Sequence, residues 1–385
     1  MTKPPLLIHS NAPWTPTGYG QQTALFTPGL SEHYDLGISA FYGLEGNIIH
    51  WHGCPVYPGI GQTHGNETIL QHAQVHMGDL RAGLAMTLMD VWVLEPAVWR
   101  QLNTCCWTPI DHEPAPDPIV SFFAESGAIP IAMSKFGEEQ LRNAGLDPLY
   151  VPHAIDTSIY KPLDKAESRE ITHLPADTFI VGQVAANKGN PSRKCFAEAM
   201  QAFRLFHAKH PEARLYLHTE ISGMFDGVNL PDLIRNTGVD PDTVIFPDQY
   251  RVIHFPYPPE IMAKIYSSLD VLLAPSAGEG FGIPVIEAQA CGVPVIVSDF
   301  SAQPELCGAG WLVSGTKVYT PLKAWQFHPD VDDIHDALRQ AYVSGDHSAK
   351  ARAHAEQYDL KVVLNRYMLP ALTEVQARFD DRKPI

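Results

Sequence analysis

The chain has 385 residues, of which 45% are hydrophobic and 18% charged, a balance typical of a globular protein and not of a disordered or fibrous one. Single hydrophobic cores stop growing at roughly 250 to 300 residues, so this length predicts about two domains. The formal net charge is −16, and residues 1–150 contain five Lys and Arg against fourteen Asp and Glu. This acidity disfavours nucleic acid and anionic membranes as partners of the first half.

The hydropathy and cysteine patterns predict a cytoplasmic protein without membrane insertion. Residues 1–9 lack the apolar core of a signal peptide, and the most apolar later stretch, residues 83–99, contains two carboxylates. The six cysteines show no CxxC spacing, so we expect reduced thiols and neither disulfides nor structural zinc.

Short runs rich in Ile, Val and Leu alternate with longer amphipathic stretches, which is typical of parallel sheets covered by helices. Predicted strands in the first half are 6–9, 37–41, 87–94, 104–108, 130–133 and 149–151. Those in the second half are 179–184, 214–218, 243–246, 270–274, 294–297 and 311–313. The pattern predicts an α/β protein with two Rossmann-like, doubly wound domains.

The polar segment 156–177 is the predicted linker, which sets the expected domain boundaries. We expect an N-terminal domain over 1–160 and a C-terminal domain over 161–345. Residues 346–385 have helical periodicity interrupted by Pro370, so we expect two helices that pack back across the domains.

The most informative stretch is residues 275–282, Pro-Ser-Ala-Gly-Glu-Gly-Phe-Gly, between a predicted strand and a predicted helix. Gly280 and Gly282 place backbone amides at the start of that helix, a site suited to the diphosphate of a nucleotide. Glu279 lies in the loop and Glu287 about one turn into the helix. Each carboxylate can accept hydrogen bonds from a vicinal diol such as ribose or a hexose.

This stretch, with its two spaced glutamates and the following Ala-Cys-Gly-Val-Pro-Val-Ile, resembles the signature of retaining group 1 (family 4) glycosyltransferases of the GT-B fold. The resemblance extends over the whole chain. It implies two Rossmann-like domains that face a central cleft, with the acceptor on the first and a nucleotide-diphosphate sugar on the second. It also implies that no metal or cofactor is required. By position, Glu279 would contact the donor sugar, Glu287 the ribose, and Phe281 with Gly282 the sugar and phosphates.

Residues 181–194 resemble the first strand of the family's donor domain and the basic pair that follows it. This implies that Arg193 and Lys194 bind the diphosphate. The common pattern of the family has Arg where this chain has Gln183, and the alternative interpretation of the basic pair is a solvated start of a helix.

In the first domain, Gly18, Tyr19 and Gly20 lie between the predicted strand 6–9 and a helix. This segment resembles the family's glycine loop, which faces the diphosphate and the acceptor. A dinucleotide site is disfavoured, because the acidic residue expected about 20 positions later is missing. Asp111 and His112 follow the predicted strand 104–108, and His112 loosely resembles the family's cleft histidine, with a structural histidine as the alternative.

Three short patterns also match metal sites. His72 and His76 have the i, i+4 spacing of a metal pair, but an ordinary helix face is the preferred interpretation. The sequences Asp-Pro-Asp at 240–242 and Asp-Val-Asp at 330–332 match the DxD of metal-dependent glycosyltransferases. Both fall at predicted turns or helix starts, and three-letter matches are frequent.

Together these patterns predict a metal-independent, retaining glycosyltransferase that moves a hexose from a UDP- or GDP-sugar to an acceptor hydroxyl. The residues expected to act in catalysis are Glu279, His112, Arg193 and Lys194. Alternatives are the same transfer onto a modified nucleobase, a nucleotide-sugar 2-epimerase on the same fold, and a nucleotide-sugar binder without turnover. The sequence does not identify the acceptor.

Overall fold

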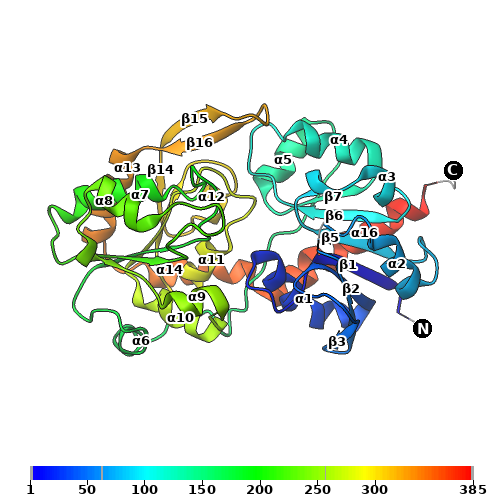
Figure 1. The fold of residues 1–385 in the computed structure, drawn as a ribbon, viewed down its shortest axis with the longest axis horizontal. Coiled ribbons are helices and arrows are strands. Elements are labelled where there is room, and N and C mark those ends of the chain that lie inside the picture. The colour runs from blue at the N-terminus through cyan, green and yellow to red at the C-terminus, as the bar shows by residue number, and fades with distance from the viewer. Residues whose placement is uncertain (1–2, 62–63, 256, 383–385) are drawn as a thin grey trace. The chain divides into compact units, whose positions relative to one another are not determined.

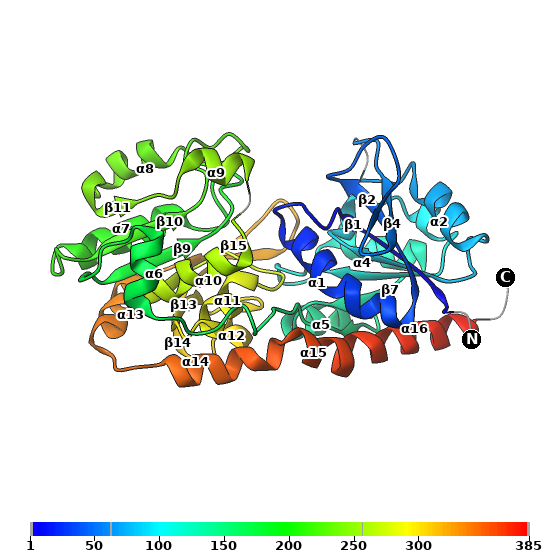
Figure 2. The ribbon, with the colours of Figure 1, turned by 90° about the horizontal axis from the view of Figure 1, so that it is seen from below.

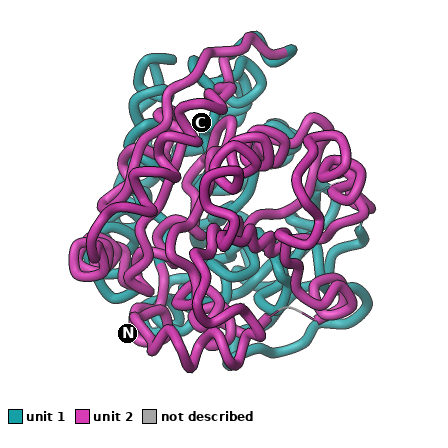
Figure 3. Tube along the Cα trace, turned by 90° about the vertical axis from the view of Figure 1, so that its left-hand side faces the viewer, with its two compact units in different colours: residues 1–154, 321–324, 360–385 teal, residues 155–320, 325–359 magenta. Residues whose placement is uncertain are grey.

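The structure is a computed structural model that describes residues 3–61, 64–255 and 257–382. The chain divides into two compact units: unit 1 comprises residues 1–154, 321–324 and 360–385, and unit 2 comprises residues 155–320 and 325–359 (Figure 3). The first boundary between the units lies between residues 154 and 155, whereas the sequence analysis predicts it between residues 160 and 161. Residues 346–385, predicted as one terminal segment, divide between unit 2 up to residue 359 and unit 1 from residue 360.

Unit 1 contains a mostly parallel sheet with the strand order β3-β4-β2-β1-β5-β6-β7-β8, in which only β3 is antiparallel to its neighbour (Figure 1). The strands are β1 (Pro5–Asn11), β2 (Asp35–Tyr42), β3 (Ile49–Trp51), β4 (Cys54–Pro58), β5 (Leu84–Leu88), β6 (Thr104–Thr108), β7 (Ile129–Ala132) and β8 (Leu149–Tyr150). The helices are α1 (Gly18–His33), α2 (Ile69–Met77), α3 (Pro96–Trp99), α4 (Asp117–Ser126), α5 (Lys135–Asn143), α15 (Leu360–Val363) and α16 (Leu369–Asp380).

Apolar side chains on the strands of unit 1 are buried under these helices. The ring of Phe26 on α1 meets the ring of Trp107 on β6 edge-on, with 5.3 Å between the centroids. Residues from α2, α3 and α4 form one buried cluster with strands β1, β5 and β6. The terminal helix α16 is tied to unit 1 by an ion pair of 3.0 Å between Arg378 and Asp147.

Unit 2 contains a second parallel sheet, with the order β11-β10-β9-β12-β13-β14, and a separate antiparallel hairpin (Figures 1 and 2). The strands are β9 (Ile180–Val184), β10 (Arg214–His218), β11 (Val244–Ile245), β12 (Val271–Ala274), β13 (Val295–Ser298), β14 (Gly310–Val313) and the hairpin β15 (Gly315–Tyr319) with β16 (Trp325–Pro329). The helices are α6 (Lys165–Thr172), α7 (Phe196–His207), α8 (Leu230–Thr237), α9 (Gln249–His254), α10 (Pro259–Ser268), α11 (Ile283–Ala290), α12 (Gln303–Leu306), α13 (Val331–Val343) and α14 (Ser348–Ala355).

Both sheets are doubly wound, as predicted. In unit 2 the chain adds strands outward from β9 to β11 and then returns to place β12 on the other side of β9. In unit 1 the same reversal occurs between β1 and β5. Ligands of such sheets bind at the carboxyl ends of the strands where the order reverses. The topology therefore directs attention to the loops after β9 and β12 and to those after β1 and β5.

Several predicted elements differ from the structure. The strand expected over 87–94 begins earlier and ends at Leu88, and a short 3-10 helix follows at Val91–Val93 because Asp90 interrupts the apolar run. The strands β3 and β4 and the hairpin β15–β16 were not predicted.

The predicted linker and the predicted break at Pro370 also have other roles in the structure. Eight residues of segment 156–177, Lys165–Thr172, form α6 in unit 2, where the 4% exposed Arg169 pairs with Asp270 at 2.7 Å. Pro370 lies in the first turn of α16, which directly follows a π-helical turn at Leu364–Met368, so the helical backbone continues past the proline.

Candidate functional site

The candidate donor site of unit 2 lies at the point where its strand order reverses. The loop after β9 carries Arg193 and Lys194, and the loop after β12 carries Glu279. Because β9 and β12 are adjacent and parallel, these loops leave the sheet side by side at its carboxyl edge. The topology thus brings together residues that are 85 or more positions apart in the chain.

Glu279 forms ion pairs with both basic residues. Its Oε2 atom accepts a hydrogen bond of 3.0 Å from Nη1 of Arg193, and its Oε1 atom accepts one from Nζ of Lys194. The Glu279 side chain is 12% exposed and that of Lys194 19%, whereas that of Arg193 is 40% exposed. Burial alone would raise the pKa of Glu279, but Lys194 and Arg193 outweigh it and lower the pKa to about 2. The carboxylate is therefore ionised throughout the physiological range, and a single negative charge faces two cations.

Backbone hydrogen bonds hold the basic pair against the glycine loop. The Ala277 amide donates to the Arg193 carbonyl at 2.8 Å, and the Arg193 guanidinium donates to the Gly278 carbonyl. From β9, Nε2 of the Gln183 side chain donates to the Lys194 carbonyl at 2.8 Å. Gln183, which replaces the Arg of the common family pattern, thus positions the backbone of the basic pair.

The loop that carries Glu279 ends at Gly282, the N-cap of α11, and any other residue at this position would be strained. Gly282 occupies the N-cap position with φ of 118° and ψ of 57°, a left-handed conformation that disfavours side chains. The backbone of Glu279 is fixed by a hydrogen bond of 2.9 Å from its amide to Oγ of Ser301. Phe281 is 3% exposed and packs against Tyr358, with 5.7 Å between the ring centroids. The Phe281 side chain thus anchors the loop, while Gly282 is only partly buried at the start of the helix.

Glu287 lies one turn into α11 and is 7% exposed. Its Oε2 atom accepts a hydrogen bond of 2.7 Å from the Tyr266 hydroxyl, and Tyr160 forms a second hydrogen bond with the carboxylate. Burial raises the pKa of Glu287, and the two tyrosine hydroxyls oppose that rise only in part. Sequence reasoning missed both tyrosines, because nothing in their own segments indicates which glutamate they reach.

In unit 1 the segment Gly18–Gly20 begins α1, after β1, where the strand order reverses between β1 and β5. Thr17 caps α1 by accepting the Gly20 amide at 3.0 Å, and the Tyr19 hydroxyl donates to Oδ2 of Asp90, after β5, at 2.9 Å. A Cβ atom on Gly20 would lie 2.1 Å from Oγ1 of Thr15. Packing alone thus requires glycine at position 20, while Gly18 is exposed at the start of α1.

Asp111 and His112 form a pair immediately after β6. Nδ1 of His112 lies 2.7 Å from Oδ1 of Asp111, and the histidine side chain is 8% exposed. An ionised carboxylate only accepts hydrogen bonds, so Nδ1 carries the proton. In the neutral imidazole Nε2 is then an acceptor, suited to a hydroxyl group of a ligand.

The patterns that matched metal sites have structural roles here. Asp240 and Asp330 accept backbone amides at the starts of a 3-10 turn and of α13. His72 is 7% exposed, and its Nδ1 lies 2.8 Å from Oγ of Ser39. Within residues 3–61, 64–255 and 257–382, no three His, Cys, Asp or Glu side chains gather in a geometry that could hold a metal ion.

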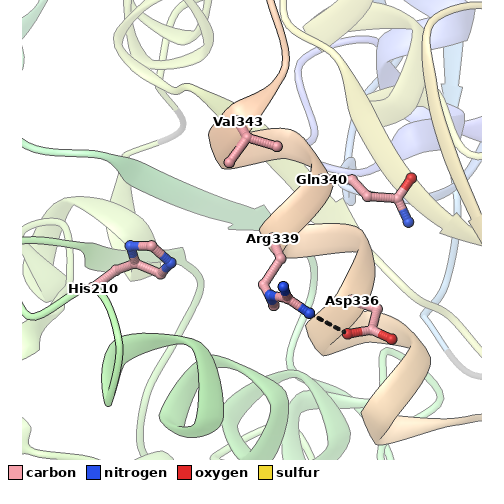
Figure 4. Close-up of a pocket in the computed structure, with 5 residues that line it drawn as sticks. All are labelled: His210, Asp336, Arg339, Gln340 and Val343. Atoms are coloured by element: carbon pink, nitrogen blue, oxygen red, sulfur yellow. Dashed lines mark hydrogen bonds and ion pairs between the residues drawn. The ribbon is translucent and has the colours of Figure 1, made fainter.

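A cavity of about 390 Å³ lies elsewhere in unit 2, between the segment that precedes β10 and helix α13 (Figure 4). It is lined by His210, Asp336, Arg339, Gln340 and Val343. The segment before β10 marks the amino-terminal edge of the sheet, opposite the Glu279 cluster. Apart from an ion pair of 3.3 Å between Arg339 and Asp336, the figure shows no convergence of polar groups, and we assign the cavity no function.

Comparison with known proteins identifies the domain that contains the Glu279 cluster. Residues 179–342 match the family described as glycosyl transferases group 1. The chain carries a group 1 glycosyltransferase domain. Arg193, Lys194, Glu279 and Glu287 all lie within the matched residues of this glycosyltransferase domain.

Curated relatives match only part of the chain. A D-inositol 3-phosphate glycosyltransferase of Acidothermus cellulolyticus is 31% identical over 156 residues, which cover 38% of this chain and 32% of the relative. The chain thus spans about a third of the length of that relative. An uncharacterized glycosyltransferase of Sulfolobus islandicus rod-shaped virus 1 is 26% identical over 250 residues, covering 62% of this chain and 71% of the viral protein.

Solved structures resemble the whole chain and establish its fold. A sucrose-phosphate synthase from Thermosynechococcus elongatus has a TM-score of 0.74 at 18% identity, covering 98% of this chain and 100% of that protein. HepE of Anabaena in complex with UDP-glucose has a TM-score of 0.70 at 15% identity, covering 97% and 99%. These similarities confirm the predicted GT-B fold. In the part of the chain that the structure describes, no helix has both the length and the apolar character needed to cross a membrane.

Proposed function

We propose that the protein is a glycosyltransferase that transfers a hexose from a UDP- or GDP-sugar to an acceptor hydroxyl. One observation carries the proposal: Arg193 and Lys194 converge on Glu279 at the glycine loop of α11, with the buried Glu287 one turn further along. Support also comes from HepE, a structural relative that was solved with UDP and with UDP-glucose.

In the proposed reaction, the bond between the sugar and the diphosphate breaks and leaves negative charge on the departing nucleotide. Arg193, Lys194 and the first amides of α11 supply positive charge in fixed positions, which is the most effective way to stabilise such a leaving group. Glu287 accepts hydrogen bonds from the ribose hydroxyls. Glu279 holds the two cations before the donor binds and accepts hydroxyls of the donor sugar once it is in place.

On the acceptor side, the proposal assigns His112 to a ligand hydroxyl group and Asp111 to the orientation of the imidazole. Tyr19 and the segment from Gly18 to Gly20 line the acceptor part of unit 1. The relative from Acidothermus cellulolyticus is named for D-inositol 3-phosphate, which is therefore one acceptor to test.

Three finer points belong to the same proposal. Retention of the anomeric configuration follows from the resemblance to retaining members of the family. Metal independence is supported by the two cations at the Glu279 cluster, which can neutralise the diphosphate. A cytoplasmic location is supported by six free cysteines, five of them buried.

The direct experiment combines nucleotide binding with product analysis. Purified protein is titrated with UDP and GDP, and their sugars are then incubated with an acceptor library, with and without EDTA. We expect acceptor-dependent release of nucleoside diphosphate that EDTA does not abolish, and a product whose anomeric proton coupling shows retention. Binding without turnover on any acceptor would favour a nucleotide-sugar binder, and donor sugar recovered with inverted C2 would favour a 2-epimerase.

A further inference from the structure

The loops at the carboxyl edge of the unit 1 sheet are strongly acidic. Because β2 and the strands from β4 to β7 run parallel to β1, the loops that follow these strands meet at one edge. These loops contain six carboxylates and no Lys or Arg: Glu45, Glu67, Asp90, Glu95, Asp111 and Glu113. Over a longer span, residues 4–80 contain neither Lys nor Arg.

Two basic residues near this edge of unit 1, one at the start of α5 and one paired with the start of α4, have partners of their own. Lys135, the first residue of α5, donates to Glu138 at 2.8 Å and lies 3.7 Å from the centroid of the Tyr150 ring. Lys323, in the segment 321–324, pairs with Asp117 at 3.7 Å. A phosphate group carries a charge of about −1.5 to −2 and is recognised by converging basic groups. This edge of unit 1 supplies carboxylates instead.

Uncharged polar and aromatic groups point to a different ligand. Asn11 ends β1 and is 6% exposed, and its Oδ1 atom has no hydrogen-bond partner within the described residues. Its Nδ2 atom donates to Oγ1 of Thr17 at 2.6 Å. Trp14 is 39% exposed, and its indole N–H is fixed on the Gly43 carbonyl at 2.8 Å, so the ring is held beside the glycine segment. An orphan acceptor and a fixed aromatic ring suit the hydroxyls and the apolar face of a sugar.

From this combination we infer that the acceptor carries no phosphate or carboxylate group and is a neutral or amino-bearing sugar. The inference rests on the proposed function, in which unit 1 binds the acceptor. Like charges brought together at a binding surface cost several kcal/mol, so the six carboxylates select against anionic acceptors. An amino group is compatible with the same edge, because it would be attracted by the carboxylates.

The test compares acceptors that share a ring and differ in one charged substituent. The full chain, saturated with donor, is assayed with glucose, glucosamine, glucuronic acid and glucose 6-phosphate, and with myo-inositol and inositol 3-phosphate. We expect kcat/KM for each anionic acceptor to be lower than for its uncharged counterpart by roughly tenfold or more at low salt. Equal or higher kcat/KM for the phosphorylated or carboxylated members, or transfer to duplex DNA containing 5-hydroxymethylcytosine, would overturn the inference.

A binding measurement decides the matter even if none of these sugars is turned over. The chain saturated with UDP or GDP is titrated calorimetrically with glucose 6-phosphate and inositol 3-phosphate. We expect neither to bind more tightly than its unphosphorylated counterpart, and tighter binding would refute the inference. Titration of the unliganded chain with UDP or GDP tests the proposed function separately. If the chain binds nucleotide but prefers phosphorylated sugars, the inference about the acceptor is wrong while the proposed function stands.

A charge-reversal pair provides the matched control. Glu67 is exposed in the loop after β4, whereas Glu32 is exposed near the end of α1, at the opposite edge of the sheet. Glu67→Lys should raise the ratio of kcat/KM for phosphorylated to neutral acceptor severalfold, and Glu32→Lys, with the same change in net charge, should not. Equal effects of the two variants would show that the loop charges do not select the acceptor.

Discussion

The ion pairs of Glu279 lead to an unusual expectation for the variant Glu279→Gln. Glutamine keeps the shape of the side chain but removes the charge that Arg193 and Lys194 share. The pKa of Glu279 is lowered from 4.5 to about 2, and this difference corresponds to roughly 3 kcal/mol of interaction in the folded state. The variant should therefore unfold more easily at neutral pH, by up to about that amount.

The pH dependence of this stability difference has a definite sign. A carboxyl group whose pKa is depressed on folding stabilises the native state above its unfolded pKa. That contribution is lost as the pH falls through the folded value, here about 2. The difference in unfolding free energy between wild type and Glu279→Gln should be largest at pH 7 and should decrease below about pH 4.5.

Nucleotide binding should respond in the opposite direction. In the wild type, a diphosphate has to compete with Glu279 for both cations, whereas in the variant the cations have no carboxylate partner there. The affinity for free UDP or GDP should stay equal or rise, up to roughly tenfold. The extra affinity that the sugar of a UDP- or GDP-sugar contributes should fall, and kcat should fall with it, because Glu279 would no longer accept the sugar hydroxyls.

Calorimetric titration with nucleotide and with nucleotide sugar measures the nucleotide affinity and the part that the sugar contributes. Urea unfolding at pH 7 and pH 3 measures the difference in unfolding free energy, and initial rates measure kcat. Glu287→Gln is the matched control, since it removes a buried carboxylate from the same helix region that the cations do not touch. It should lose nucleotide affinity. If Glu279→Gln loses affinity for free nucleotide as strongly as Glu287→Gln does, the competition described here does not exist.

Three further variants test the surroundings of the site. Tyr266→Phe removes a hydrogen bond to Glu287, so affinity should fall up to roughly tenfold for UDP but much less for its 2′,3′-dideoxy analogue in calorimetry. The double variant Arg193→Gln, Lys194→Gln should lose more in kcat than in donor affinity, because charge on the diphosphate grows as the bond breaks; unchanged kcat would make the pair a surface feature. Gly282→Ala should lower the melting temperature through a strain of about 1 to 3 kcal/mol at its φ of 118°, and an unchanged value would refute that strain.

Much of the fold was predictable because its signals are local. The strands 104–108 and 214–218 were predicted with the bounds that the structure has, since each is a compact apolar run. The edge strand β3 has three residues and two exposed positions, so it lacks the burial that makes a strand visible in a sequence. The segment 156–177 is polar because α6 is a half-exposed helix, and its attachment through Arg169 to Asp270 depends on a residue about 100 positions away.

The part of the candidate site that lies within one sequence motif could be predicted. The contacts between residues far apart in the sequence could not. The residues from Glu279 to Glu287 form one loop and helix, so their proximity follows from the local sequence. That Glu279 would pair with both Arg193 and Lys194 depends on the adjacency of β9 and β12, which only the strand order establishes. The hydrogen bonds from Tyr160 and Tyr266 to Glu287 likewise arise from tertiary packing.

The central claim is that unit 2 binds a nucleoside diphosphate at the Glu279 cluster, and a crystal structure of the full chain with UDP or GDP tests it most directly. We predict the phosphates within hydrogen-bond distance of Arg193, Lys194 and the first amides of α11, and the ribose hydroxyls on Glu287. A nucleotide bound instead at the segment Gly18–Gly20 of unit 1, or phosphates that touch neither basic residue while Glu279 keeps both ion pairs, would contradict the account.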